Sequence, residues 1–300
     1  MKKYRESTYK TPILFLVFNR IDTTKKVFEQ IRKIRPSKLY ISSDGPRETV
    51  SGEFEKVIEI RNYLESNIDW DCEINTLFRK KNLGCKIAVS SAIDWFFEHE
   101  NHGIILEDDC VPTISFFNFL EKSLNKYKND KDIFMISGFN KYPSFFHKNH
   151  FKSKFGSIWG WGTWRDRWEK YDVEISNWHQ KYSFDDLKND CKSHFLATKY
   201  KLDFDSIKNE KMDTWDFQVQ FSLFFENMFC VYPKHNLVKN IGIIGHHSAG
   251  ITKSHNTSVN EKFKFIKQSK IKFSLFYEWK YLLDLKKMKI KSILYKFLNN

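Results

Sequence analysis

The sequence lacks the cysteine patterns that stabilise small secreted proteins or bind zinc. It has an odd number of cysteines and no CxxC pair. A disulfide framework and a zinc knuckle are therefore not indicated, and we expect reduced thiols, as in a cytoplasmic protein. The five are Cys72, Cys85, Cys110, Cys191 and Cys230.

Long apolar runs are also missing. The apolar stretch near the N-terminus covers only residues 12–18, which is too short for the core of a signal peptide with its cleavage site. No run reaches the roughly 18 residues that a membrane-spanning helix needs. We therefore expect a cytoplasmic protein that is either soluble or peripheral on the inner face of the cell membrane.

Acidic residues are scarce in the C-terminal segment. The 300-residue chain has 50 Lys and Arg against 37 Asp and Glu, a net charge of +13. Residues 261–300 hold eleven lysines and three acids, so this segment alone carries +8. The first 260 residues are only mildly basic, which argues against nucleic acid as a partner. The excess favours an anionic partner for the C-terminal segment.

Short apolar runs alternate with helical spacing between residues 12 and 140, which is typical of strand–helix–strand units. The runs show little polar–apolar alternation, as in parallel strands covered on both faces. The predicted strands are 13–18, 38–42, 73–78, 103–106 and 133–137. The fold class is therefore predicted to be α/β, with a mixed, mostly parallel sheet, helices on both faces and a C-terminal helical segment.

Helices are expected between these strands. Asp22 is placed to cap the first, whose Val27, Ile31 and Ile34 share one face, and Pro36 ends it. Others are expected around 57–64, at 87–97, at 114–127 and from 214 to 229. Residues 156–164 predict a bent loop lined by aromatic side chains, and 230–244 a short strand and turn. Ligands of such sheets bind at the carboxyl ends of the strands.

Three consecutive acids, Glu107, Asp108 and Asp109, follow the fourth predicted strand. Adjacent carboxylates repel one another unless a cation or hydrogen-bond donors neutralise them. The cluster therefore favours a bound divalent ion that also bridges diphosphate oxygens. A solvated acidic turn or a helix cap is the alternative. The buried strand before the cluster, and polar groups at neighbouring strand ends, favour the site.

At these residues the sequence resembles the type-A-fold glycosyltransferases, whose donor-binding strand ends in a DxD or EDD motif. The bacterial nucleotide-sugar transferases related to N-acetylglucosaminyltransferase I are the branch that it most resembles. The resemblance covers roughly residues 11–245. Residues 12–20, the Asp44-Gly45 turn, Asn82-Leu83-Gly84 and the tryptophan-rich stretch follow in the family's order.

The resemblance implies a metal-dependent transferase that uses a nucleotide-diphosphate sugar, most simply a UDP-sugar, with Mn²⁺ or Mg²⁺. By this resemblance the base and ribose of the donor are held by Asn19, Arg20 and Asp44. The donor sugar and ribose are faced by Glu107 and Asp108. The metal ligand is implied to be Asp109, joined by a late histidine. His247 is the candidate and His255 its rival, because the sequence departs from the family pattern here.

The turn around Asn82 is basic, with Arg79, Lys80, Lys81 and Lys86 nearby. A helix N-terminus with adjacent cations binds anions, so Lys86 is expected to contact the donor diphosphate. A solvated basic turn explains these lysines equally well.

An inverting reaction is expected, which requires a carboxylate base. Asp216, in the sequence Thr214-Trp215-Asp216, resembles the family's base, with Asp213 as substitute and an ordinary helix cap as the alternative. For the acceptor, aromatic rings that stack on sugar faces are expected, against core packing as the alternative. The three rings are Trp159, Trp161 and Trp164.

The expected organisation is a catalytic domain at 1–260, with a nucleotide-sugar-binding half at 11–140 and an acceptor-binding half at 141–260. A basic amphipathic tail follows at 261–300. Its lysines alternate with apolar residues, which suits an anionic membrane surface, although a helix packed on the domain shows the same pattern.

The sequence therefore predicts a glycosyltransferase acting on a glycan or lipid-linked glycan in surface polysaccharide synthesis. A nucleotidyltransferase that makes activated sugars is the second interpretation, but the expected glycine-rich loop is absent from residues 18–22. A non-catalytic basic adaptor is the third, and it leaves the three acids unexplained. The identity of the sugar, the acceptor and the oligomeric state stay open.

Overall fold

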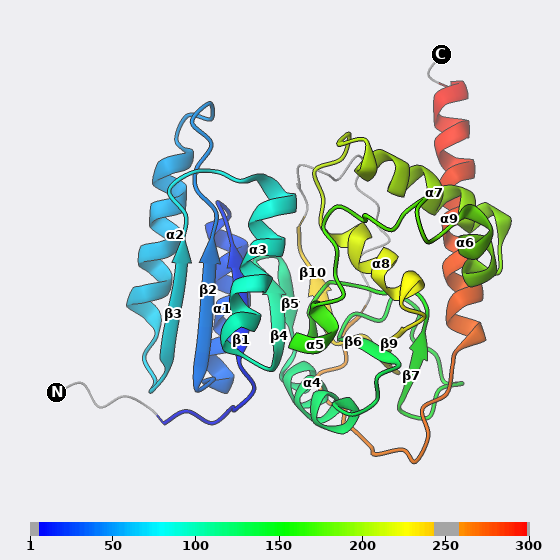
Figure 1. Cartoon of the computed structure of the whole chain (residues 1–300). Coiled ribbons are helices and arrows are strands. Elements are labelled where there is room, and N and C mark those ends of the chain that lie inside the picture. The colour runs from blue at the N-terminus through cyan, green and yellow to red at the C-terminus, as the bar shows by residue number, and fades with distance from the viewer. Residues whose placement is uncertain (1–5, 243–257, 299–300) are drawn as a thin grey trace.

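The computed structural model describes residues 6–242 and 258–298, and it places them around one eight-stranded sheet (Figure 1). The strand order is β3-β2-β1-β4-β8-β6-β9-β7, with β7 and β8 antiparallel to the others. The α/β class with a mixed, mostly parallel sheet is confirmed. The strands are β1 Ile13–Val17, β2 Lys38–Ser43, β3 Glu73–Phe78, β4 His102–Glu107, β6 Ile133–Ser137, β7 His150–Ser153, β8 Trp161–Trp164 and β9 Phe229–Pro233.

A second, two-stranded sheet pairs β5 (Cys110–Pro112) with β10 (Val238–Asn240). It begins directly after the acidic turn and joins that turn to the segment after β9. Where the sequence predicted one short strand between 230 and 244, the structure has two, β9 and β10.

Helices cover both faces of the large sheet. The four helices predicted before residue 130 are confirmed, but the helix from 214 ends at Phe225 because β9 begins at Phe229. Asp22 does not cap α1, since Arg20 occupies that position and Asp22 lies in the first turn. The helices are α1 Ile21–Ile34, α2 Glu53–Asn67, α3 Gly84–His99, α4 Ile114–Tyr127, α5 Arg165–Trp168, α6 Phe184–Cys191, α7 His194–Lys208, α8 Asp216–Phe225 and α9 Leu275–Leu298.

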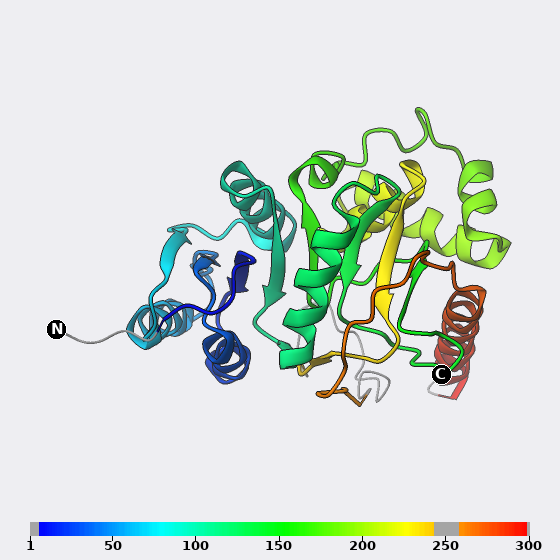
Figure 2. The same cartoon turned by 90° about the horizontal axis from the view of Figure 1, so that it is seen from below.

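Alternation along the central strands produces two cores. In β1, Ile13 and Phe15 enter the core under α1, α2 and α4, whereas Leu14 and Leu16 enter the core under α3 and α8. Figure 2 shows α1 and α2 on one side of the strands and α3 on the other. Each fully buried side chain of this size contributes roughly 1.5–3 kcal/mol to folding. Because β1 is buried on both faces, all five of its residues are apolar.

Two predictions about strands were wrong. β3 is not covered on both faces, because it is the edge strand and leaves Glu73 and Ile74 exposed. The tryptophan-rich stretch is not only a loop, because β8 lies in the middle of the sheet between β4 and β6. Gly162 makes this close approach possible, since a Cβ there would lie 2.7 Å from the Gly103 carbonyl oxygen.

The C-terminal segment packs against the domain. Phe263 is buried in the first core and Tyr277 in the second. Tyr281, Leu282 and Leu285 of α9 pack against a third apolar cluster formed mainly by α6, α7 and α8. Among the described residues, none of the helices is both long enough and apolar enough to cross a membrane.

His150 on β7 is a buried neutral group that predicts acid sensitivity. Its Nε2 lies 2.6 Å from the Tyr127 hydroxyl, and Gln268 donates to its Nδ1 over 2.9 Å. Burial, helped by the charge of Lys126, lowers the pKa of His150 to about 4. The unfolded chain, with an ordinary histidine pKa near 6.5, then binds more protons between about pH 4 and 6.5.

We therefore expect stability to be complete above about pH 6.5 and to fall as the pH decreases toward 4, with His150 accounting for about 3 kcal/mol of the loss. Urea unfolding at several pH values should show a flatter profile for His150→Gln, which does not titrate. Because carboxylates also titrate in this range, the difference between variant and wild type is the informative quantity. Parallel profiles would contradict the prediction.

Candidate active site at the switch point of the sheet

The chain reverses its direction of sheet growth at β1. It adds β2 and then β3 on one side of β1 and afterwards places β4 on the other side. In such sheets the carboxyl ends of the two strands at the reversal border the ligand site. Arg20 follows β1, and Glu107 ends β4 directly opposite Leu16. The predicted donor residues therefore lie where this rule locates a ligand.

Arg20 binds the acidic turn. Its Nη1 donates to Asp109 Oδ2 over 2.9 Å, and its Nη2 donates to Asp108 Oδ1. Asp108 is buried, Asp109 is mostly buried, and about a third of the Arg20 side chain is exposed. Arg20, which the sequence assigned to the nucleotide, thus supplies the positive charge that the clustered acids require.

The turn remains electrostatically crowded despite this cation. Burial, reinforced by the charges of Asp109, Asp108 and Asp216, holds the pKa of Glu107 well above its ordinary value. Burial also raises the pKa of Asp108 to about 6, against the opposing effect of Arg20. Both shifts favour the protonated, uncharged form of these two acids.

The described residues do not fit a divalent cation as they stand. Outside residues 1–5, 243–257 and 299–300, no group of three or more His, Cys, Asp and Glu side chains could hold a metal. Asp109, the predicted ligand, is bound by Arg20, and a Cβ on Gly242 would lie 2.3 Å from its Oδ2. His247 and its rival His255 lie outside the described residues.

Asp44, at the end of β2, organises the neighbouring turn. Its carboxylate accepts hydrogen bonds from Gly45 N at 2.9 Å, Asn82 Nδ2 at 2.9 Å and Leu83 N at 3.0 Å. Burial raises the pKa of Asp44, and the backbone donors Leu83 and Gly45 oppose that effect. Asp44, which the sequence predicted to bind the nucleotide, therefore holds the turn that leads into α3.

The N-terminus of α3 binds a carboxylate of the protein itself. Asp213 accepts from Cys85 N at 3.0 Å and Lys86 N at 2.8 Å. The Lys86 ammonium pairs with Glu174 at 2.7 Å. Without a ligand Lys86 pairs with this internal acid, and its contact with a diphosphate stays a prediction. Asp213, the substitute base, serves as a helix cap.

Asp216, in the second half of the chain, lies within electrostatic range of the acidic turn. It is the first residue of α8, and the Thr214 hydroxyl donates to its Oδ1. Its charge contributes to the raised pKa of Glu107 and also to that of Cys85. Burial is the main cause for Cys85, whose pKa rises to about 12, so this thiol is not a nucleophile at neutral pH.

Two of the three predicted acceptor rings are core residues. Trp161 is completely buried between Trp168 and Trp215, with ring centroids 6.0 Å from each, and Trp164 is buried in the core on the opposite face of β8. The prediction of a stacking platform is wrong for Trp161 and Trp164 because the strand turns both indoles into the protein. Trp159 is half-buried against Phe139, and its acceptor role stays a prediction.

The sequence did not predict one buried ion pair beside the site. Glu53 is almost fully buried, and it accepts from Asn19 Nδ2 at 2.8 Å and from Arg47 N at 2.7 Å. Hydrogen bonds from the Arg47 side chain, opposed by burial, lower the pKa of Glu53 to about 2. Nothing in the sequence distinguishes it from the exposed Glu55, because only the fold turns Glu53 inward.

Removing the Arg20 side chain should leave two mostly buried carboxylates unpaired. Breaking a buried pair by deleting one partner costs 3–5 kcal/mol, and partial exposure of Arg20 reduces this to about 2–4 kcal/mol for Arg20→Ala. The matched control is Arg32→Ala, whose Asp69 pair is more exposed and should contribute less than about 1 kcal/mol. Urea unfolding at neutral pH measures both, and equal losses would contradict the special role of Arg20.

No protein-family model and no curated protein matches this sequence. Solved structures match it at a distance. HddC from Yersinia pseudotuberculosis is 12% identical over 42% of this chain and 57% of its own, with a TM-score of 0.29. The mannosyltransferase PcManGT from Pyrobaculum calidifontis, in complex with GDP-Man and Mn²⁺, is 12% identical over 57% and 50%, with a TM-score of 0.37.

A UDP-glucose pyrophosphorylase complexed with UDP-glucose is 9% identical over 74% of this chain and 89% of its own, with a TM-score of 0.37. This chain spans little more than half the length of HddC and half that of the mannosyltransferase. Sugar transferases and pyrophosphorylases match equally distantly, so no branch is singled out. What this chain shares with these proteins is a distant likeness of fold.

Proposed function

We propose that the protein transfers a sugar from a nucleotide-diphosphate donor to a glycan or lipid-linked glycan acceptor. One observation carries the proposal: at the switch point of the sheet Arg20, which follows β1, binds the two acids that follow β4, and the charge of Asp216 at the start of α8 acts on Glu107 in the same turn. Doubly wound sheets bind nucleotides at this position. A transferase needs there a cation for the diphosphate and a carboxylate for the acceptor hydroxyl.

Arg20 is suited to hold the donor diphosphate. A guanidinium has five N–H donors in a planar fork that matches phosphate oxygens, and its contacts to Asp108 and Asp109 use one donor on each Nη. The exposed third of the side chain can then face the diphosphate. The acids behind the guanidinium fix its orientation before the donor arrives.

Asp216 is the proposed general base. It lies in the half of the chain assigned to the acceptor, and its charge reaches Glu107 at the end of β4. The Thr214 hydroxyl holds one carboxylate oxygen, which leaves the other to accept the proton of the acceptor hydroxyl as that oxygen attacks the anomeric carbon. Glu107 is assigned to contact a hydroxyl of the donor sugar.

The connection between β1 and α1 favours a transferase over a nucleotidyltransferase. Only Phe18, Asn19 and Arg20 separate the strand from the helix, and none is glycine. A nucleotidyltransferase is expected to use a glycine-rich loop here, whose backbone N–H groups surround the phosphates. In this protein a side chain, Arg20, occupies that place.

Replacing Asp216 should separate chemistry from donor binding. We expect Asp216→Asn to keep donor affinity within about threefold while lowering donor hydrolysis or transfer by about 10²–10⁴-fold, the usual contribution of a general base. A thermal-shift screen of nucleotide sugars identifies the donor, and release of the nucleoside diphosphate measures turnover. The exposed Asp185→Asn on α6 is the matched control.

Two results would contradict the proposal. In the first, no nucleotide sugar changes the melting temperature of the wild type or is turned over by it. In the second, the protein forms a nucleotide sugar from a nucleoside triphosphate and a sugar phosphate, which would establish the nucleotidyltransferase instead.

Metal dependence, with Asp109 and His247 as ligands, is a separate proposal that the sequence motivates. Because Arg20 binds Asp109, a divalent cation and the guanidinium compete for this carboxylate. We expect Arg20→Ala to bind Mn²⁺ at least about tenfold more tightly than the wild type, which corresponds to about 1.4 kcal/mol. Titration followed by electron paramagnetic resonance measures this, with the double variant Arg20→Ala/Asp109→Ala as control. Unchanged affinity would rule out competition at Asp109.

A further inference from the structure

Exposed apolar side chains gather around the start of α9. The exposed fraction is 80% for Phe145, 68% for Phe146, 76% for Leu275 and 53% for Trp279. Ring contacts join them, from Phe145 to Phe146 at 4.3 Å and from Phe146 to Phe276 at 5.5 Å. Phe276 in turn lies 6.4 Å from Trp279. These five residues form one continuous surface, here named the aromatic patch.

The aromatic patch is built on a fixed loop. His147 lies 2.6 Å from the Ser274 hydroxyl through its Nε2 and stacks on Phe151 at 3.9 Å. The Ser144 hydroxyl accepts from Phe146 N at 3.1 Å. The loop between β6 and β7 is therefore attached to the residue before α9. Its two phenylalanines are held outward by the structure around them.

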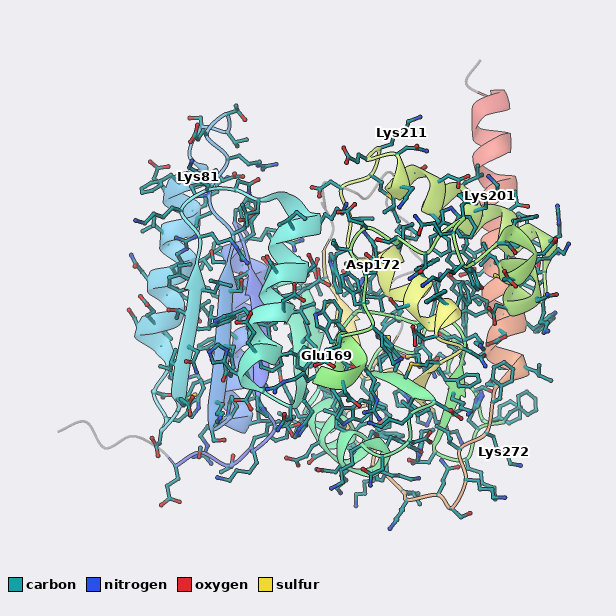
Figure 3. All side chains as sticks on the ribbon, in the orientation of Figure 1. Lys81, Glu169, Asp172, Lys201, Lys211 and Lys272 are labelled. Atoms are coloured by element: carbon teal, nitrogen blue, oxygen red, sulfur yellow. The ribbon has the colours of Figure 1, made fainter. Side chains whose placement is uncertain are left out.

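The charges beside the aromatic patch are positive. Lys148 follows the loop, Lys272 lies on the chain just before α9 (Figure 3), and the Lys280 ammonium lies 5.2 Å from the Trp279 ring. The acids of the same segment are directed inward. Glu278 accepts from Lys154 N at 2.8 Å, and Asp284 pairs with Lys141. Lys148, Lys272 and Lys280, which lie beside the patch along the chain or against its rings, are here named the lysine rim.

We propose that the aromatic patch and its lysine rim dock on the surface of an anionic lipid bilayer. Aromatic rings partition into the interfacial region of a bilayer, and ammonium groups contact anionic headgroups. Each lysine near such a surface strengthens binding by roughly fivefold. A protein partner would need acidic groups positioned around an apolar centre, whereas an anionic bilayer offers both without a fixed pattern.

This surface differs from the lysine-rich tail that the sequence predicts. Two of its four rings come from the loop at 145–146, far from residues 261–300 in the chain. On the part of α9 whose side chains are described, Tyr277 and Tyr281 face the protein and Trp279 is exposed. The inference is independent of the proposed enzymatic activity, because no residue of the acidic turn takes part.

Vesicle co-sedimentation of the full chain tests the docking. We expect the protein to bind vesicles that contain phosphatidylglycerol and to bind neutral phosphatidylcholine vesicles at least about tenfold more weakly, with the difference decreasing at high salt. Phe145→Ser/Phe146→Ser/Trp279→Ser should lower binding to anionic vesicles by at least about tenfold. Lys148→Gln/Lys272→Gln/Lys280→Gln should remove the preference for anionic lipid.

A matched control is available at the other end of the molecule. Phe54 is 59% exposed on α2, which lies at the opposite end from α9 (Figure 1), so Phe54→Ser should bind vesicles as the wild type does. Circular dichroism and the melting temperature confirm that each variant is folded. Wild-type binding by the folded aromatic variant would overturn the proposal, as would a wild type that binds no vesicle.

Self-association is the third outcome that would overturn it. If the wild type dimerises without lipid in size-exclusion chromatography and the aromatic variant is monomeric, the patch is an interface between two copies of the chain.

Discussion

The contact of Arg20 with Asp108 and Asp109 is the interaction on which the candidate site depends. Buried carboxylates lose hydration and repel one another, so three in succession need a compensating charge. Arg20 supplies it with a planar fork that two carboxylates can share. Because β1 and β4 are hydrogen-bonded neighbours, the sheet itself sets the separation between the cation and the acids. The same contact leaves about a third of the Arg20 side chain exposed at the point where such sheets bind nucleotides.

The segment before α8 connects the two halves of the chain at this site. Asp213 caps α3, which belongs to the first half, and the charge of Asp216, three residues later, acts on Glu107 at the end of β4. The hydrogen bonds that α3 donates to Asp213 therefore hold the segment just before α8 against the first half of the chain. The site is consequently shared between the halves, and a change in the position of α8 would alter the helix cap and the acidic turn together.

The packing of the basic C-terminal segment shows which of its apolar residues are available to a partner. Its apolar residues divide between the protein interior, as for Tyr277, and an exposed surface, as for Trp279. Phe145 and Phe146, from the loop between β6 and β7, add their rings to this exposed surface through the contact of Phe146 with Phe276. Charge therefore gathers next to hydrophobic surface at the edge of the sheet opposite β3, away from the end of the strands that carries the acids.

By itself the sequence determined the fold class, the first five strands of the large sheet to within a residue or so at each end, and the position of the acids at the end of β4. These features depend on local periodicity and on apolar runs, which neighbouring residues alone produce. It did not determine which charge neutralises the acids, because Arg20 and Asp109 are far apart in the chain and meet only through the pairing of β1 with β4. Likewise, only the tertiary structure decided that Trp161 is a core residue in a central strand and that Asp213 caps α3. The burial of a side chain and the identity of its contact partner depend on the assembled sheet, so a sequence pattern over a few residues does not predict them.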